Sequence, residues 1–266
     1  MPIEYMDFEV ARKADGLRMV VVTGVPSPWG EAAKGILHLR QIPWQAVRLD
    51  AASDAMAEWT GERSGPVAIY NDEEPRSGWA EILLLAERLA SPANSTAASE
   101  RTPSLLPEAP ADRAHAFGLA HEICGEDGLG WMRRLQGIHA GLSGEPGFPP
   151  PVAQYLADKY GYRAEEAESH GQRIRDILGL LSGRLREQKQ SGSPYYFGDR
   201  LTAVDVYSAT FMALFAPLPA DQCPMAEALR PGFSSMDEAT AQALEPILLE
   251  HRDLIYNKYL ELPLTL

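Results

Sequence analysis

The chain has 266 residues, of which 45 % are hydrophobic and 23 % charged, the usual balance of a globular protein rather than a disordered or membrane-embedded one. This length allows one large domain or two ordinary ones, and either buries a core without disulfides or metals. The formal net charge of −13 repels phosphate backbones and anionic lipids, which argues against nucleic acid and membrane surfaces as partners.

Residues 1–15 form an N-terminal extension ahead of the first strand pattern. Acidic residues stand among the first seven, where a secretory signal needs a basic stretch followed by an apolar one. We therefore expect a cytoplasmic location.

Residues 17–49 are predicted to form a βαβ unit. Residues 17–23 are a β-branched apolar run typical of a buried strand, and residues 24–30 are rich in turn-forming types. From Glu31 onward the apolar residues have helical spacing, and residues 44–49 alternate between apolar and polar types like a second strand. The two strands should be parallel, with a right-handed crossover.

The rest of the first domain, residues 16–90, continues with shorter elements. A short helix around residues 56–59 precedes a strand over residues 67–70, and residues 75–76 lead to a short edge strand or a loop. Residues 79–90 have the apolar spacing of a strongly amphipathic helix. This order of elements predicts a thioredoxin-like α/β domain.

Strand patterns end at a linker over residues 91–110, which is rich in proline and small polar residues. Residues 111–266 are predicted to form an all-helical domain. One helix stripe ends near Ser191, a capping pattern from Ser235 to Glu238 starts another helix, and Pro246 precedes the last one.

Most residues with metal or redox chemistry lack the required spacing. Cys124 and Cys223 form no CxxC motif, so neither a disulfide framework nor CxxC redox chemistry is expected. The histidines lack the spacing of metal ligands, and no metal is predicted.

Ser27 lies in the turn between the first strand and the first helix. Free N–H groups and the helix dipole favour an anion at a helix N-terminus, so a hydroxyl there can hold a bound thiolate. Lowering a thiol pKa from about 8.5 by two units needs only about 2.7 kcal/mol, the order of one or two charge-assisted hydrogen bonds. The alternative is that Ser27 only caps the helix or the turn.

Two other local patterns stand out. Gly65-Pro66 precedes the third strand, where a cis bond would turn the preceding backbone outward to pair with an extended peptide. A trans proline at the start of an edge strand is the alternative. Thr202 and Asp205 form a capping box before a nearly apolar helix, which is a structural motif rather than a catalytic one.

These motifs together resemble the glutathione transferase superfamily. The resemblance rests on the strand–Ser-Pro-Trp–helix turn, the proline before the third strand and the Gly-Asp-Xaa-Leu-Thr-Xaa-Xaa-Asp segment, and it covers residues 16–266. It implies a thioredoxin-like glutathione-binding domain followed by an all-helical domain, with glutathione as co-substrate. By this resemblance Ser27 faces the glutathione sulfur, and the cofactor-binding residues are Trp29, Gly65, Pro66 and Ser77.

One departure from the family pattern concerns the γ-glutamyl end of glutathione. The family places Glu-Ser at the start of the third helix, whereas this chain has Arg76-Ser77-Gly78. Ser77 keeps the hydroxyl, the acid is absent, and the register also allows Gly78 in place of the serine.

The resemblance implies a detoxifying transferase that joins the glutathione thiolate to a small apolar electrophile, with Trp131 as a candidate wall of the electrophile site. It also implies a homodimer. The alternative function is a non-catalytic ligand-binding or assembly protein with the same fold, which the Arg76-Ser77-Gly78 departure favours.

Overall fold

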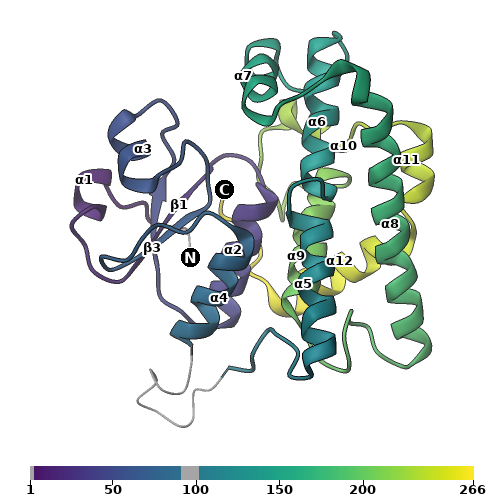
Figure 1. The fold of residues 1–266 in the computed structure, drawn as a ribbon, viewed down its shortest axis with the longest axis horizontal. Coiled ribbons are helices and arrows are strands. Elements are labelled where there is room, and N and C mark those ends of the chain that lie inside the picture. Colours follow the sequence, from purple (N-terminus) through teal and green to yellow (C-terminus); the bar gives the residue numbers. More distant parts are fainter. Residues whose placement is uncertain (1–2, 91–101) are drawn as a thin grey trace. The chain divides into compact units, whose positions relative to one another are not determined.

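The computed structural model describes residues 3–90 and 102–266 of the chain, which fall into two compact units. The first unit holds the described residues up to Leu105 together with Pro219–Met225 and Tyr256–Leu266. The second holds Leu106–Leu218 and Ala226–Ile255 (Figure 1). The predicted extension and linker lie partly outside the described residues, at positions 1–2 and 91–101.

The sheet of the first unit has the strand order β2-β1-β3, where β1 is Leu17–Val21, β2 is Gln45–Arg48 and β3 is Val67–Tyr70. Strand β1 is parallel to β2 and antiparallel to β3, with Met19 opposite both Ala46 and Ala68. All five residues of β1 are buried, as expected for the apolar run of a central strand. The predicted parallel βαβ unit is confirmed.

A fourth strand is reduced to one antiparallel bridge between Ala68 and Arg76. Each of these residues donates its N–H to the other's carbonyl at 2.9 Å. Pro75 has no N–H to extend the ladder, and a helix begins soon after at Trp79.

Helices lie on both faces of this sheet, namely α1 (Phe8–Ala11), α2 (Pro28–Leu39), α3 (Asp54–Thr60) and α4 (Trp79–Leu89). Helices α2 and α4 contact each other and lie on one side of the sheet in Figure 1. On the other side, Ala11 of α1 and Met56 of α3 pack in one cluster with Val20, Val47 and Val67.

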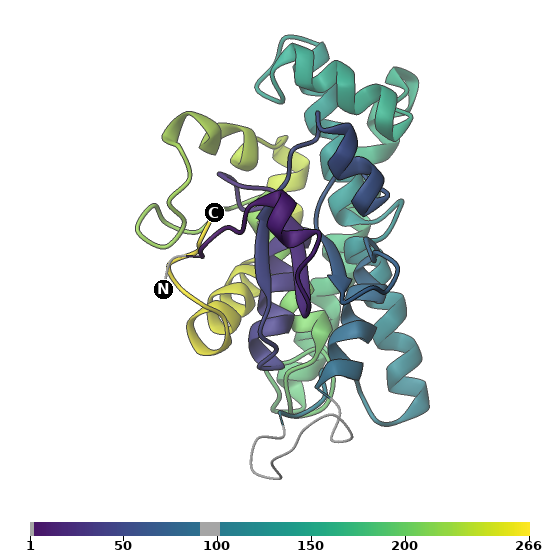
Figure 2. The ribbon, with the colours of Figure 1, turned by 90° about the vertical axis from the view of Figure 1, so that its left-hand side faces the viewer.

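Both ends of the described chain belong to the first unit (Figure 2). At the N-terminal end, Tyr5 forms a parallel bridge to Ala46, and the N–H of Met6 donates to the Ala46 carbonyl at 2.8 Å. At the C-terminal end, the N–H of Leu264 donates to the Gln222 carbonyl at 2.7 Å. Neither contact follows from a strand pattern in the sequence.

The described residues of the second unit are helical and contain no strand, which agrees with the predicted all-α half. Its helices are α5 (Pro110–Cys124), α6 (Leu129–Leu142), α7 (Pro150–Tyr160), α8 (Ala167–Gln190), α9 (Ala203–Phe211), α10 (Arg230–Ser234), α11 (Glu238–Ala243) and the part of α12 (Pro246–Tyr259) up to Ile255, with 3₁₀ turns at Ala164–Glu166, Met212–Leu214 and Glu227–Leu229. Every residue of α9 is buried, which makes it the central helix of this unit.

The start of α11 differs from the prediction. Its N-cap is Asp237, whose carboxylate accepts the Thr240 N–H at 2.7 Å, and not Ser235. The Ser235–Glu238 pattern predicts the helix correctly but places its cap two residues early. A carboxylate at the N-cap also benefits from the helix dipole, which favours Asp237 over a neutral hydroxyl.

Helix α9 begins at a buried hydrogen-bond network around Asp205. One carboxylate oxygen of this side chain accepts the N–H and the hydroxyl of Thr202, at 2.7 and 2.8 Å. The other oxygen accepts the Tyr196 N–H at 2.9 Å and lies 3.0 Å from Nε2 of His251. Asp205 therefore connects the start of α9 to the preceding loop and to α12.

Candidate functional site

Three segments of the first unit meet at one edge of the sheet. Strand β1 ends at this edge and leads into the Ser27 turn, while β3 begins there after Pro66, because Val20 pairs with Val67 in antiparallel register. The antiparallel bridge at Arg76 returns the chain to the same edge, where α4 begins. The N-termini of α2 and α4 thus lie at the same end of the sheet as the Gly65–Pro66 bond.

Ser27 is the N-cap residue of α2, but its side chain makes no capping hydrogen bond. Its carbonyl accepts the first helical hydrogen bond, from the N–H of Glu31 at 2.8 Å. Pro28 fills the first helical position, where a missing N–H is tolerated. The half-buried Ser27 hydroxyl therefore lies at the positive end of a helix without being used to cap it, which argues against the capping alternative.

The Gly65–Pro66 peptide bond is cis. Pro66 is buried at the start of β3, and Gly65 lies against the end of β1. A Cβ added at Gly65 would be 3.0 Å from the Val20 carbonyl oxygen and 3.5 Å from the Val21 Cα. A side chain at this position would therefore force the backbone of the central strand to shift by a few tenths of an ångström.

We expect Gly65→Ala to lower the free energy of unfolding by about 1–3 kcal/mol, because the added methyl group meets backbone atoms of the central strand. Urea unfolding measures this difference. The matched control is Gly179→Ala on an exposed turn of α8, where an added Cβ meets nothing within 4 Å. The control should gain about 0.5–1 kcal/mol from helix propensity. Equal stability of the two variants would contradict the packing argument.

The α4 N-terminus contains the sequence that departs from the family pattern. Ser77 is exposed directly before the N-cap residue Gly78, whose N–H donates to Glu81 Oε2 at 3.0 Å. The guanidinium of Arg76 donates to Glu73 Oε2 at 2.7 Å. Hydrogen bonds from Arg88, and then from Arg76, hold the pKa of the Glu73 carboxyl below its usual range. Arg76 is thus committed to a surface ion pair.

The two tryptophans predicted for the site belong to different units. Trp29 is half-buried in the first turn of α2. Trp131 is half-buried in α6 and meets the Tyr160 ring edge-on at 4.7 Å, and the Tyr160 hydroxyl accepts from Arg134 at 2.6 Å. The first unit therefore brings Ser27, Trp29, Gly65, Pro66 and Ser77 together in one compact body, whereas Trp131 packs within the helical unit.

None of the helices in residues 3–90 and 102–266 combines the length and apolar character needed to cross a bilayer. Over the same residues, no group of three or more histidine, cysteine, aspartate or glutamate side chains is arranged to hold a metal ion.

No family model matches this chain, and neither does any curated protein. Solved structures do match over most of its length. A tau-class glutathione S-transferase from mango (Mangifera indica) is 18% identical, with a TM-score of 0.55, over 90% of this chain and 89% of that one. A glutathione transferase family member from Pseudomonas fluorescens, crystallised with two glutathione bound, is 13% identical, with a TM-score of 0.58 over 92% and 89%.

Ure2p in complex with glutathione is also similar, at 14% identity and a TM-score of 0.51 over 89% of this chain and 98% of that one. The chain therefore has the glutathione transferase fold, a thioredoxin-like domain followed by an all-helical domain.

Proposed function

We propose that this protein is a glutathione transferase in which Ser27 stabilises the glutathione thiolate. The observation that carries this proposal is the Ser27 hydroxyl, placed at the N-terminus of α2 without a capping role. The proposal is supported by the position of Gly65 and Pro66 at the same sheet edge and by similar folds crystallised with glutathione.

In this proposal the thiol of glutathione loses its proton to solvent, and the thiolate attacks an electrophilic carbon of a small apolar substrate. A sulfur–carbon bond forms as the leaving group departs with its electron pair, or as an electron pair moves into an activated double bond. The Ser27 hydroxyl donates a hydrogen bond to the sulfur, which favours the thiolate over the thiol.

We assign the peptide part of glutathione to the backbone at Gly65 and Pro66 and to the N-terminus of α4. The first-turn N–H groups of a helix and its positive dipole end suit a carboxylate. Ser77, exposed at this N-terminus, is the proposed donor to the γ-glutamyl carboxylate. Trp29 is assigned to the rim of the same site.

Glutathione binding is the direct test. At a concentration of about 100 Kd, a ligand specific for the folded state adds about 2.7 kcal/mol, which for a chain of this size raises Tm by roughly 5–11 °C. We expect such a rise with millimolar glutathione, and retention on immobilised glutathione. If Tm is unchanged and the protein passes through the column unretained, the transferase proposal is wrong.

A second candidate function is a non-catalytic binding or assembly protein with this fold. The observation that favours it is the α4 N-terminus, where Arg76 pairs with Glu73 and Glu81 accepts the Gly78 N–H. Under this alternative, glutathione binds but 1-chloro-2,4-dinitrobenzene and activated alkenes are not conjugated above the uncatalysed rate.

For the transferase we further propose a cytoplasmic homodimer with a detoxifying role. Sedimentation velocity checks whether its mass is that of two chains.

A further inference from the structure

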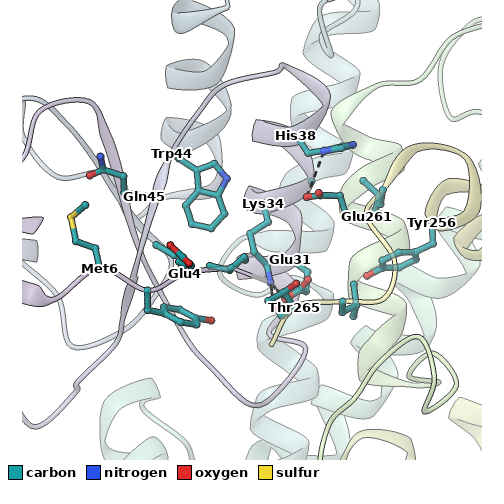
Figure 3. Close-up of a pocket in the computed structure, with 16 residues that line it drawn as sticks. Glu4, Met6, Glu31, Lys34, His38, Trp44, Gln45, Tyr256, Glu261 and Thr265 are labelled. Carbon is teal, nitrogen blue, oxygen red and sulfur yellow. Dashed lines mark hydrogen bonds and ion pairs between the residues drawn. The ribbon is translucent and has the colours of Figure 1, made fainter. Parts of the chain in front are cut away.

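The first unit contains a cavity that shares no residue with the proposed glutathione site (Figure 3). Its volume is about 760 Å³, within the range of about 300–1,000 Å³ that is usual for small-molecule sites. It is lined by one face of α2, the start of β2, the N-terminal segment 3–6 and the C-terminal segment 256–265. The N-terminal extension is thus one of its walls.

A buried ion pair forms the polar part of this cavity. Glu31 and Lys34, one turn apart on α2, have side chains only 8% and 12% exposed, and Lys34 Nζ lies 2.6 Å from Glu31 Oε1. The same ammonium donates to the Thr265 carbonyl at 2.7 Å (Figure 3). Lys34 is therefore neutralised and held in place, and it offers little to an anionic ligand.

Gln45 Oε1, an amide oxygen of another residue that lines the cavity, is buried and has no hydrogen-bond partner among the described residues. Burial raises the pKa of Glu31, and Lys34 opposes this effect only in part. A buried acceptor left without a donor costs about 1–3 kcal/mol, so a site that keeps one favours a ligand that supplies an N–H.

The charges around the cavity also favour a cation. Glu4 and Glu261 are exposed lining residues, and His38 Nδ1 lies 3.5 Å from Glu261 Oε2 (Figure 3). With neutral histidine, the three lining carboxylates and one lysine give a formal charge of −3 + 1 = −2.

Trp44 supplies an open aromatic surface. Its half-buried indole lines the cavity, and within residues 3–90 and 102–266 no other ring or cation is stacked on it. Tyr5 differs, because the Arg48 guanidinium already covers its ring at 4.5 Å. Aromatic faces next to carboxylates are the usual surroundings of bound organic ammonium groups.

We propose that this cavity binds an amphipathic organic amine, whose ammonium group lies among the lining carboxylates and donates to Gln45 Oε1, and whose apolar body lies against Trp44. The site is independent of the glutathione site, and it requires the N-terminal and C-terminal segments that wall it.

The test is a fluorescence titration of the full chain with three dansyl or naphthalene probes of different charge. Monodansylcadaverine is the cation, dansylamide the neutral analogue and 8-anilinonaphthalene-1-sulfonate the anion. We expect the cation to bind at least tenfold more tightly than the other two at low ionic strength. Tighter binding of the anion or the neutral probe overturns the proposal.

Three variants locate the binding. Trp44→Ala should weaken cation binding by about tenfold or more, because it removes the apolar wall. The double variant Glu4→Gln with Glu261→Gln should weaken binding of the cation by about five- to tenfold. It should leave the affinity for dansylamide unchanged, because the two exposed charges act only on a charged ligand. The charge-matched control is Glu58→Gln with Glu126→Gln, two exposed carboxylates outside the cavity, which should leave all three affinities unchanged.

Both double variants change exposed side chains, so we expect them to fold normally. Circular dichroism checks the folding of Trp44→Ala, which changes a half-buried side chain. Equal losses in the cavity and control double variants would mean that only the overall charge attracts the probe. Displacement of the cation by saturating glutathione would place it in the glutathione site. Either result overturns the proposal, whereas failure of glutathione itself to bind leaves it intact and overturns only the proposed function.

Discussion

The Ser27→Ala variant should lose about 10- to 150-fold in kcat/KM for the electrophile, measured with saturating glutathione near neutral pH. This range corresponds to about 1.5–3 kcal/mol, the contribution of one hydrogen bond to a charged group. The Ser27 hydroxyl makes no capping hydrogen bond, so its removal costs the helix little and the loss falls on the bound thiolate.

The pH dependence separates this role from a merely structural one. A hydroxyl that donates to the thiolate favours the ionised form and lowers the thiol pKa, so the alanine variant raises it by about one to two units. The rise of kcat/KM with pH then moves to higher pH by the same amount. The loss is largest below the wild-type thiol pKa and shrinks as pH increases.

Two controls accompany this measurement. Ser27→Thr keeps a hydroxyl at the same position and should retain most of the wild-type pH profile. The Ser77→Ala variant lies at the other helix N-terminus and should raise the KM for glutathione without moving the profile, because it does not touch sulfur. An unchanged pH profile in Ser27→Ala contradicts the proposed role of Ser27, whatever its rate.

Periodicity along the chain was enough to predict the elements whose burial is set locally. The apolar run of β1, the spacing in α2 and the alternation in β2 each indicate one buried face, and the parallel pairing follows from the crossover between them. The fully buried α9 was predicted in the same way, because its apolar character extends all round the helix.

Contacts between distant parts of the chain could not be predicted from such patterns. In the sequence, Glu31 and Lys34 look like an ordinary solvated i,i+3 pair. In the folded chain both are buried, and the Lys34 ammonium also donates to the carbonyl of Thr265, 231 residues further along. Met6 binds the edge of β2 through a single backbone hydrogen bond, which is too short a pairing to leave an alternating pattern. The sequence therefore contains no signal for the cavity beside α2.

The candidate glutathione site lies between these two cases. The resemblance pointed to Ser27, Gly65 and Pro66, and the sheet register brings their segments to one edge. The sequence could not show that the Ser27 hydroxyl makes no capping hydrogen bond, because a serine at an N-cap position usually accepts one from the first turn of its helix.

The second large effect is expected at Asp205, whose replacement by alanine should cost about 3–5 kcal/mol of unfolding free energy. This carboxylate is fully buried and is a hydrogen-bond partner of Thr202, Tyr196 and His251. Without it, buried donors lose their acceptor at three places, and a buried polar group without a partner costs about 1–3 kcal/mol. Thermal unfolding should show a drop of roughly 6–20 °C in Tm.

Asp199→Asn is the matched control, because Asp199 is exposed and lies six residues earlier in the same segment. It should change stability by no more than about 0.5 kcal/mol, as surface substitutions usually do. A comparable loss in both variants would mean that charge, and not the buried network, sets the effect.

A double-mutant cycle assigns part of the Asp205 effect to Thr202. The Thr202→Val variant keeps the side-chain shape and removes only the hydroxyl that donates to Asp205 at 2.8 Å, so we expect a loss of about 1–2 kcal/mol. Combined with Asp205→Ala, it should add little further loss, because the acceptor of that hydroxyl is already gone. Fully additive losses would show that the two side chains stabilise α9 independently. The Asp205 effect would then belong to its hydrogen bonds with Tyr196 and His251, which connect the start of α9 to the preceding loop and to α12.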